Sequence, residues 1–126
     1  MRLAIIGSRD ITEFDMETIL FHLPKKVEAI LSGGAKGVDS LAEEFARRQG
    51  IPFLKVLPNY PRYGKKAPIM RNLEIVRQAD YLLAIWDYKS RGTAHAIACC
   101  IREGVPVRIL NADGAPVEPD PRLFEL

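Results

Sequence analysis

Five short apolar runs alternate with stretches of helical periodicity, and this alternation constrains the fold more than any other feature of the chain. The runs occupy residues 2–6, 27–31, 52–57, 80–86 and 105–110. Runs of this length are typical of strands that are buried on both faces. Between them, apolar residues recur every three or four positions, as in the amphipathic stripe of residues 38–46. The order predicts βαβ units, and therefore an α/β fold of three layers, α/β/α, around a mostly parallel five-stranded sheet.

Length, charge and hydropathy bound the organisation of the chain. Its 126 residues predict a single domain, in which residues 110–126 are irregular and Leu123 and Phe124 are available to pack on the body or on another subunit. The formal net charge of +2 does not indicate the strongly cationic surface of many nucleic-acid-binding proteins. No apolar run approaches the roughly 18 residues of a membrane span, and the N-terminal run is too short for a signal peptide. We therefore expect a cytoplasmic protein without a membrane partner.

The two cysteines, Cys99 and Cys100, are neighbours in the sequence. A disulfide between adjacent residues is strained, and two thiols are too few for a structural zinc site. We expect small, partly buried, reduced thiols, with a redox pair as the alternative. No other spacing of residues suggests a metal site.

Three loops that follow predicted strands carry glycine, hydroxyl and charged residues. They cover residues 7–10, 32–39 and 87–93. In parallel sheets the carboxyl ends of the strands form the ligand crevice. Glycines let backbone N–H groups approach a ligand, and the first turn of the following helix adds free donors and partial positive charge. These loops predict a site for a phosphate-bearing small molecule, whereas the alternative is that the glycines only make tight turns.

The residues expected to contact this ligand come from the three loops and from the helix before the fourth strand. They are Gly7, Ser8, Arg9, Ser32, Gly33, Gly34, Ala35, Lys36, Gly37, Asp39, Arg71, Ser90, Arg91, Gly92 and Thr93. An arginine such as Arg71 can hold a phosphate through two parallel hydrogen bonds. Asp39 has two open roles, because it can hold the glycine loop or bind a ribose hydroxyl. The dinucleotide fingerprint G-x-G-x-x-G and the Gly-Lys-Ser/Thr of a Walker A loop are both missing.

Arg71, Glu74 and His95 are the candidates for a catalytic role. His95 follows Gly92 by three residues and can exchange a proton near neutral pH, although it can equally be a packed helix residue. Glu74 lies one helical turn after Arg71, and glycosidic hydrolysis usually needs a positioned carboxylate. We expect His22, in the first helix, to be structural.

Four motifs in this order resemble the SLOG superfamily, and within it the single-domain YspA/YpsA-related branch. They are GSRD, SGGAKGVDSLAEEFA, RNLEIVRQADYLLAIWD and SRGTAHAI, and the resemblance extends over roughly residues 5–107. It implies a Rossmann-like fold and a nucleotide or ADP-ribose-like ligand, with no other cofactor firmly implied. Such relatives tend to pair, so a homo-oligomer is expected. The branch has no settled activity to carry over.

Two better understood relatives of this branch point in different directions. In the LOG-type phosphoribohydrolases, an Arg-Lys pair falls where Arg71 and Asn72 stand, which by resemblance places both residues at the site and gives Arg71 the catalytic arginine's role. Their Pro-Gly-Gly-x-Gly-Thr-x-x-Glu loop aligns with Gly92 and Thr93, but Ala96 replaces its Glu. That loss argues against the same hydrolytic mechanism.

The other relative is the DprA family, which binds single-stranded DNA and shares the loop formed by residues 32–39. The basic stretch of residues 62–66, with Tyr60 beside it, can stack on and neutralise single-stranded DNA, or it can cover a nucleotide as a lid. Because the net charge is close to neutral and three loops predict a phosphate site, the sequence favours a nucleotide-binding or sensing protein. The alternatives are a nucleoside-monophosphate N-glycosidase, which would use Glu74 or His95, and a single-stranded DNA-binding protein of DprA type.

Overall fold

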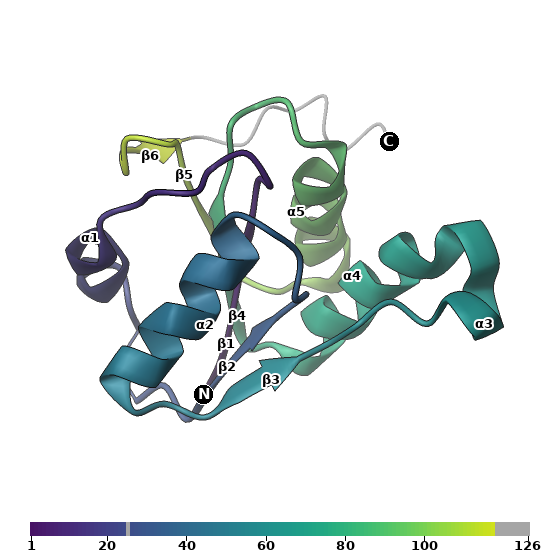
Figure 1. Cartoon of the computed structure of the whole chain (residues 1–126), viewed down its shortest axis with the longest axis horizontal. Coiled ribbons are helices and arrows are strands. Elements are labelled where there is room, and N and C mark those ends of the chain that lie inside the picture. The colour runs from purple at the N-terminus through teal and green to yellow at the C-terminus, as the bar shows by residue number, and fades with distance from the viewer. Residues whose placement is uncertain (25, 118–126) are drawn as a thin grey trace.

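The computed structural model describes residues 1–24 and 26–117, and in it a six-stranded sheet forms the centre of the molecule (Figure 1). The strands are β1 (Arg2–Gly7), β2 (Ala29–Ser32), β3 (Phe53–Lys55), β4 (Tyr81–Ile85), β5 (Val107–Leu110) and β6 (Pro116–Val117). Their order in the sheet is β3-β2-β1-β4-β5-β6. The first five strands are parallel, and β6 runs antiparallel to β5. The strand order reverses between β1 and β4, where α/β folds open a crevice at the carboxyl ends of the strands.

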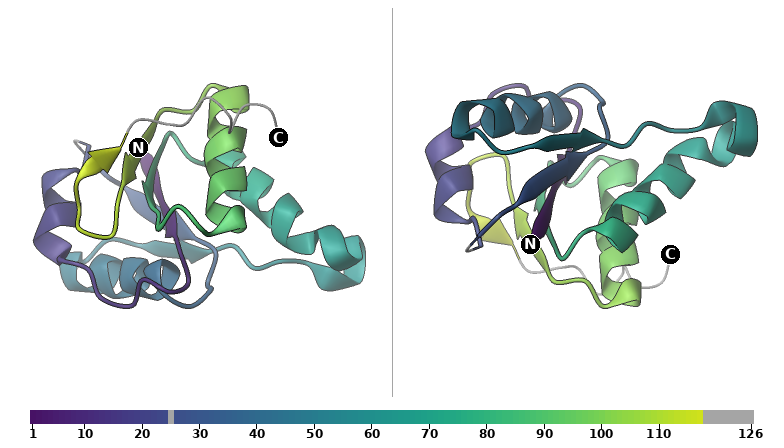
Figure 2. Two further views of the ribbon diagram at one scale, coloured as in Figure 1. Left: turned by 90° about the horizontal axis from the view of Figure 1, so that it is seen from above. Right: turned by 90° about the horizontal axis from the view of Figure 1, so that it is seen from below.

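Helices cover both faces of the sheet (Figure 2). They are α1 (Met16–Phe21), α2 (Val38–Gln49), α3 (Tyr60–Tyr63), the 3-10 helix η1 (Gly64–Lys66), α4 (Ala67–Gln78) and α5 (Arg91–Glu103). The two hydrophobic clusters divide accordingly, because α1 and α2 pack on one face and α4 and α5 on the other. The predicted three-layer α/β/α arrangement is therefore confirmed.

Burial on both faces explains why the strands read as unbroken apolar runs. In β1, Leu3 and Ile5 pack toward α1 and α2, whereas Ala4 and Ile6 pack toward α4 and α5. All four are nearly or completely inaccessible to solvent. Burying one large aliphatic side chain contributes about 1.5–3 kcal/mol, so these strands anchor the loops that follow them.

Two segments predicted to be irregular contain regular structure. Residues 110–126 include β6, because the Asn111 side chain accepts hydrogen bonds from the amides of Asp113 (2.9 Å) and Ala115 (3.0 Å) and so turns the chain back along β5. The sheet therefore has six strands instead of the predicted five. Leu123 and Phe124, which we expected to pack on the body or on another subunit, lie outside the described residues.

The second such segment covers residues 58–68. The Asn59 side chain accepts a hydrogen bond from the Arg62 amide at 3.1 Å and begins the one-turn helix α3. Helix α4 then begins at Ala67, with Pro68 in its first turn, where the missing N–H of a proline removes no helical hydrogen bond. In Figure 1, α3 lies beyond the start of α4 and away from the sheet.

Two features of the described residues bear on partners and metals. No helix among them is long and apolar enough to cross a membrane. Across residues 1–24 and 26–117, no group of three or more His, Cys, Asp or Glu side chains is placed to hold a metal ion.

Candidate functional site

A cavity of about 170 Å³ lies at the carboxyl ends of the central strands. The glycine-containing loops after β1, β2 and β4 meet there, and α4 closes one side. Most of the predicted site residues line it, namely Gly7, Arg9, Gly33, Ala35, Asp39, Arg71, Asn72, Ser90, Gly92 and Thr93. The structure thus brings together residues from three loops and one helix that are widely separated in the sequence.

Arg71 reaches from α4 to the glycine loop after β2. Its Nη1 donates a 2.7 Å hydrogen bond to the Gly33 carbonyl oxygen, and its Nε donates to Asn72 Oδ1 at 3.2 Å. A Cβ atom at position 33 would lie only 2.6 Å from Arg71 Nη1, so this approach requires glycine. Among the described residues, Nη2 of Arg71 has no hydrogen-bond partner, and the guanidinium can therefore bind an anion in the cavity.

Asp39, in the first turn of α2, holds the same loop from the other side. Its side chain is buried, and Oδ2 accepts a hydrogen bond from the Ala35 amide at 3.0 Å. Burial raises the pKa of the Asp39 carboxyl, although the Ala35 hydrogen bond, the nearby Ser32 hydroxyl and the Arg71 charge oppose that rise. This geometry fits the structural role that the sequence left open for Asp39.

Ser32 lies behind the cavity lining, and its hydroxyl is fully buried. Among the described residues, this oxygen makes no hydrogen bond within ordinary geometric limits. The hydroxyl is nevertheless close enough to the Asp39 carboxyl to oppose the rise of its pKa.

The loop after β1 is tied to both neighbouring loops through Ser8. The Ser8 amide donates to the Ile85 carbonyl oxygen at 3.0 Å, and its hydroxyl accepts from the Asp87 amide at 2.9 Å. The Ser8 carbonyl oxygen accepts from the Val38 amide at 3.3 Å. Gly37 has a φ of 74°, and a Cβ atom there would lie 2.5 Å from the Ser8 carbonyl oxygen. Ser8 is completely buried and is not part of the cavity lining, so its contacts position the loops, and its predicted contact with a ligand stays a prediction.

The loop after β4 presents the start of α5. Ser90 caps this helix, because its Oγ accepts from the Thr93 amide at 3.3 Å and lies 3.0 Å from Thr93 Oγ1. Asp87 holds the loop through hydrogen bonds from the amides of Lys89 (2.8 Å) and Ser90 (2.9 Å). The indole Nε1 of Trp86 donates to the Ser90 carbonyl oxygen at 3.0 Å. The first turn of α5 thereby faces the cavity in a fixed position.

These contacts change the pKa of the Asp87 carboxyl. Burial alone would raise its pKa, but the hydrogen bonds from the Ser90 and Lys89 amides and from Ser8 outweigh burial and lower it. Sequence reasoning assigned no role to Asp87 or Trp86. An aspartate two and three residues before the amides that it caps is a recognisable Asx-turn signal, and it could have identified Asp87.

Several predicted residues lie outside the lining of the cavity. Gly34, Lys36 and Arg91 are exposed at its rim or beyond it. Glu74 is exposed on α4, and His95 faces a separate groove between α4 and α5. The carboxylate that lines the cavity is that of Asp39 and not that of Glu74. The catalytic roles of Arg71, Glu74 and His95 stay predictions.

The helix α3 presents an exposed aromatic and basic surface near α4. Tyr60 is 56% exposed, and the Arg62 guanidinium lies 5.1 Å from the centre of the Tyr63 ring. Lys65 and Lys66 follow in η1 and are exposed as well. Cations interleaved with aromatic rings are the combination that single-stranded nucleic acids bind.

Fold and site together define a Rossmann-like α/β protein with a crevice at the carboxyl edge of its sheet that Arg9 and Arg71 line together with glycines of the neighbouring loops. Residues 1–71 match the family described as DNA recombination-mediator protein A. Gene 61 protein of Mycobacterium phage D29 is 34% identical, over 84% of this chain and 93% of that protein. The chain belongs to the DNA recombination-mediator protein A family, which confirms the predicted relationship to SLOG and DprA domains.

A solved structure shares the fold. DNA processing protein A from Helicobacter pylori, described for its single-stranded DNA binding mode, superposes with a TM-score of 0.69 and 24% identity. The superposition covers 90% of this chain and 69% of that chain. The Rossmann-like fold expected from the sequence is therefore confirmed.

Proposed function

We propose that the chain binds single-stranded DNA, with a backbone phosphate seated in the cavity between Arg71, the glycine loop and the first turn of α5. The observation that carries this proposal is the position of Arg71, which lines the cavity. Its Nη1 is held on the Gly33 carbonyl oxygen, whereas its Nη2 has no partner among the described residues. The single-stranded DNA binding described for the Helicobacter pylori protein and the family of this chain support the proposal.

The size of the cavity favours a strand passing over the site rather than an enclosed small ligand. Pockets that enclose a small organic ligand typically have volumes of about 300–1,000 Å³, whereas this cavity has about 170 Å³. A phosphate with part of its sugar fits such a volume. The bases would then lie outside the cavity, where Tyr60 and Tyr63 of α3 offer rings for stacking.

Electrostatics at the site favours an anion but not a highly charged one. Arg9 and Arg71 line the cavity together with the buried Asp39. The N-terminal turn of α5 adds backbone donors and partial positive charge. Since the whole chain carries a formal charge of only +2, we expect few phosphate contacts and a moderate salt dependence of DNA binding.

A nucleotide or ADP-ribose-like small molecule is the second candidate ligand. The observation that favours it is the pairing of Asp39 with Arg71 in one cavity, because a carboxylate can accept a hydrogen bond from a ribose hydroxyl while arginine holds a phosphate. In that case the exposed side chains of α3 and η1 would act as a lid.

Fluorescence anisotropy with a labelled oligothymidine tests the proposal, with unlabelled nucleotides and ADP-ribose as competitors. Arg71→Gln should weaken DNA binding roughly 10- to 150-fold, since a hydrogen bond to a charged group contributes about 1.5–3 kcal/mol. It should also lower the magnitude of the log–log salt slope by about 0.7, which is the effect of one phosphate contact with a single strand.

Arg77→Gln is the matched control, because Arg77 lies on the same helix and pairs with Glu103 instead of lining the cavity. It should leave the DNA affinity close to that of the unmodified protein. Equal losses for both variants would contradict the assignment of the site to Arg71. Complete competition by a nucleotide, without DNA binding of its own, would favour the second candidate.

A further inference from the structure

Tyr88, in the loop between β4 and α5, combines an unusual backbone conformation with an exposed ring. Its φ is 67°, in the left-handed region that bulky residues rarely adopt. Such a conformation persists only where the surrounding structure enforces it, and it is most frequent at functional sites. Tyr88 is nevertheless 58% exposed, so packing of its ring in the core does not explain why a tyrosine stands here.

The neighbours of Tyr88 hold this conformation in place. Asp87 Oδ1 accepts hydrogen bonds from the Lys89 amide at 2.8 Å and from the Ser90 amide at 2.9 Å. The Tyr88 ring meets the ring of Trp86, with the two centroids 5.1 Å apart and the planes inclined by 39°. The loop therefore presents the ring to solvent from a fixed position, and a ligand that contacts it does not have to order it first.

A second cavity, of about 220 Å³, lies beside this loop and adjoins the first cavity, which is proposed to hold a DNA phosphate. Arg9 and Ser90 line both cavities. Asp87 and Lys89, the neighbours of Tyr88 in the chain, also line the second one. A strand whose phosphate occupies the first cavity can therefore continue over Arg9 and Ser90 toward Tyr88.

The charges around the second cavity favour an uncharged part of the strand. Its lining contains two cations, Arg9 and Lys89, and two carboxylates, those of Asp10 and Asp87. Because these formal charges cancel, the second cavity lacks the excess of positive charge that attracts a phosphate. A base carries no charge, and an aromatic ring beside the cavity gives it a surface for stacking.

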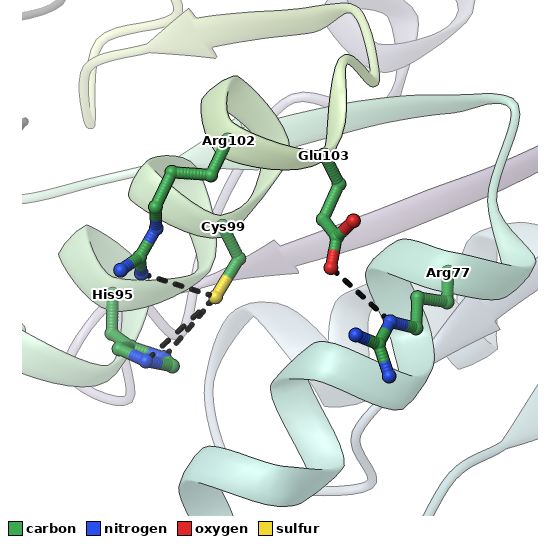
Figure 3. Close-up of polar contacts among 5 residues, drawn as sticks. All are labelled: Arg77, His95, Cys99, Arg102 and Glu103. Atoms are coloured by element: carbon green, nitrogen blue, oxygen red, sulfur yellow. Dashed lines mark hydrogen bonds and ion pairs between the residues drawn. The ribbon is translucent and has the colours of Figure 1, made fainter.

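The groove between α4 and α5 is another direction in which a strand can leave the first cavity. Its polar side chains, shown in Figure 3, are those of Arg77, His95, Cys99, Arg102 and Glu103. Arg77 Nε donates to Glu103 Oε1 at 3.1 Å, and Arg102 Nη2 donates to the sulfur at 3.7 Å, so both cations are engaged within the groove. None of the described residues that line this groove also lines the first cavity, so the strand finds no shared contact in that direction.

We propose that Tyr88 is a base-stacking residue for single-stranded DNA, an inference that rests on the proposed function. Helix α3 precedes α4, on the side where Pro68 and Arg71 line the first cavity, whereas Tyr88 lies on the side of Arg9 and Ser90. The rings of α3 and the ring of Tyr88 thus hold bases on two sides of one bound phosphate.

Trp86 provides a direct measurement of this contact. It is the single tryptophan of the chain, and its ring meets that of Tyr88. A base stacked on Tyr88 should change the Trp86 emission during titration with oligothymidine, with the same dissociation constant as fluorescence anisotropy gives. Constant emission while the labelled strand binds would overturn the proposal.

The main test compares two labelled strands of equal length by fluorescence anisotropy. One is oligothymidine, and the other consists of abasic nucleotides, which keep the phosphates and lack the bases. Tyr88→Gly removes the ring, and glycine adopts the positive φ without strain. It should weaken oligothymidine binding about 5- to 150-fold, the loss typical of one base–aromatic stack, and change abasic binding by less than about twofold. Arg71→Gln should weaken the binding of both strands alike, because it removes a phosphate contact.

Two variants serve as controls. Tyr88→Phe keeps a ring that can stack, and it should bind both strands as the unmodified chain does. Phe21→Ala removes a ring of α1 that is 83% exposed and lines neither cavity, and it should affect neither strand. Circular dichroism and melting temperatures compare the fold of each variant with that of the unmodified chain.

The outcomes separate this inference from the proposed function. An unmodified chain that binds neither strand would overturn both. Oligothymidine binding that is weakened by Arg71→Gln and unchanged by Tyr88→Gly would overturn the role of Tyr88 alone. Equal losses for the two strands in Tyr88→Gly would also overturn it, because a distorted loop weakens phosphate contacts as well as base contacts.

Discussion

The substitution Gly33→Ala tests the site most directly, because it adds a single methyl group at the point where Arg71 meets the glycine loop. The new Cβ would lie 2.6 Å from Arg71 Nη1, 2.9 Å from Cζ and 3.0 Å from Asp39 Oδ2. Both contacts with the guanidinium are under 3.0 Å, so the guanidinium must move to relieve them. We therefore expect the hydrogen bond from Arg71 to the Gly33 carbonyl oxygen to be lost.

The magnitude follows from that bond. A hydrogen bond involving a charged group contributes about 1.5–3 kcal/mol, and Arg71 is only partly buried, so water recovers some of this energy. We expect the free energy of unfolding to fall by about 1–2 kcal/mol, which for a domain of this size lowers the melting temperature by roughly 3–10 °C. Oligothymidine binding should weaken about tenfold or more, because the guanidinium no longer faces the cavity.

Gly92→Ala is the matched control, since it is also a glycine-to-alanine change in the lining of the same cavity. No atom lies within 4 Å of a Cβ built at this position, and Gly92 is in the first turn of α5. It should leave stability unchanged or raise it by up to about 1 kcal/mol, the difference in helix propensity. Calorimetry measures the stability of this variant, and fluorescence anisotropy measures its binding of oligothymidine.

A double-mutant cycle decides the mechanism. In the Arg71→Gln background, Gly33→Ala should have little further effect on DNA binding, because the group that it displaces is already gone. Additive losses, or a Gly33→Ala protein that binds DNA as well as the unmodified chain, would refute the argument that this glycine exists to admit Arg71.

Three further predictions concern the loops around the site. Ser90→Ala should cost about 0.5–2 kcal/mol, measured by urea unfolding, because it removes the cap of α5; an unchanged midpoint would contradict the capping role. Gly37→Ala should destabilise more strongly than Gly33→Ala, since it combines a left-handed φ of 74° with contact against the Ser8 carbonyl oxygen, and a smaller shift in melting temperature would speak against this. Because burial raises the pKa of folded Asp39, the folded state binds this proton more tightly than the unfolded state does, so the contribution of Asp39 to stability should fall as pH rises above about 4; Asp39→Asn should remove that contribution from the pH profile of the melting temperature, and an identical pH profile would refute it.

The central strands and the position of the site could be predicted from the sequence because both depend on local patterns. Apolar runs such as residues 80–86 are buried on both faces, and parallel strands place their carboxyl ends at one edge of the sheet. The short elements gave no such pattern. Strand β6 has two residues and depends on the Asn111 turn, and α3 has four residues, including a proline.

The directions of the side chains were the second feature that could not be predicted from the sequence. His95 follows Gly92 by three residues, which suggested that it shares the site. At about 100° per residue, helix rotation instead aligns His95 with Cys99 and Arg102, facing α4. The contact between Arg71 and Gly33 joins residues 38 positions apart, and neither local sequence contains a sign of it.

The two ends of the sheet influence how the protein behaves at high concentration. Unpaired strand edges are templates on which other chains can add, and natural proteins shorten or interrupt them. Here one edge is β3, with three residues and the exposed Lys55. The other is β6, with two residues, of which Pro116 has no amide hydrogen to donate. Within residues 1–24 and 26–117, neither edge offers a long ladder of free hydrogen-bonding groups, and this protects the sheet against edge-to-edge addition of other chains.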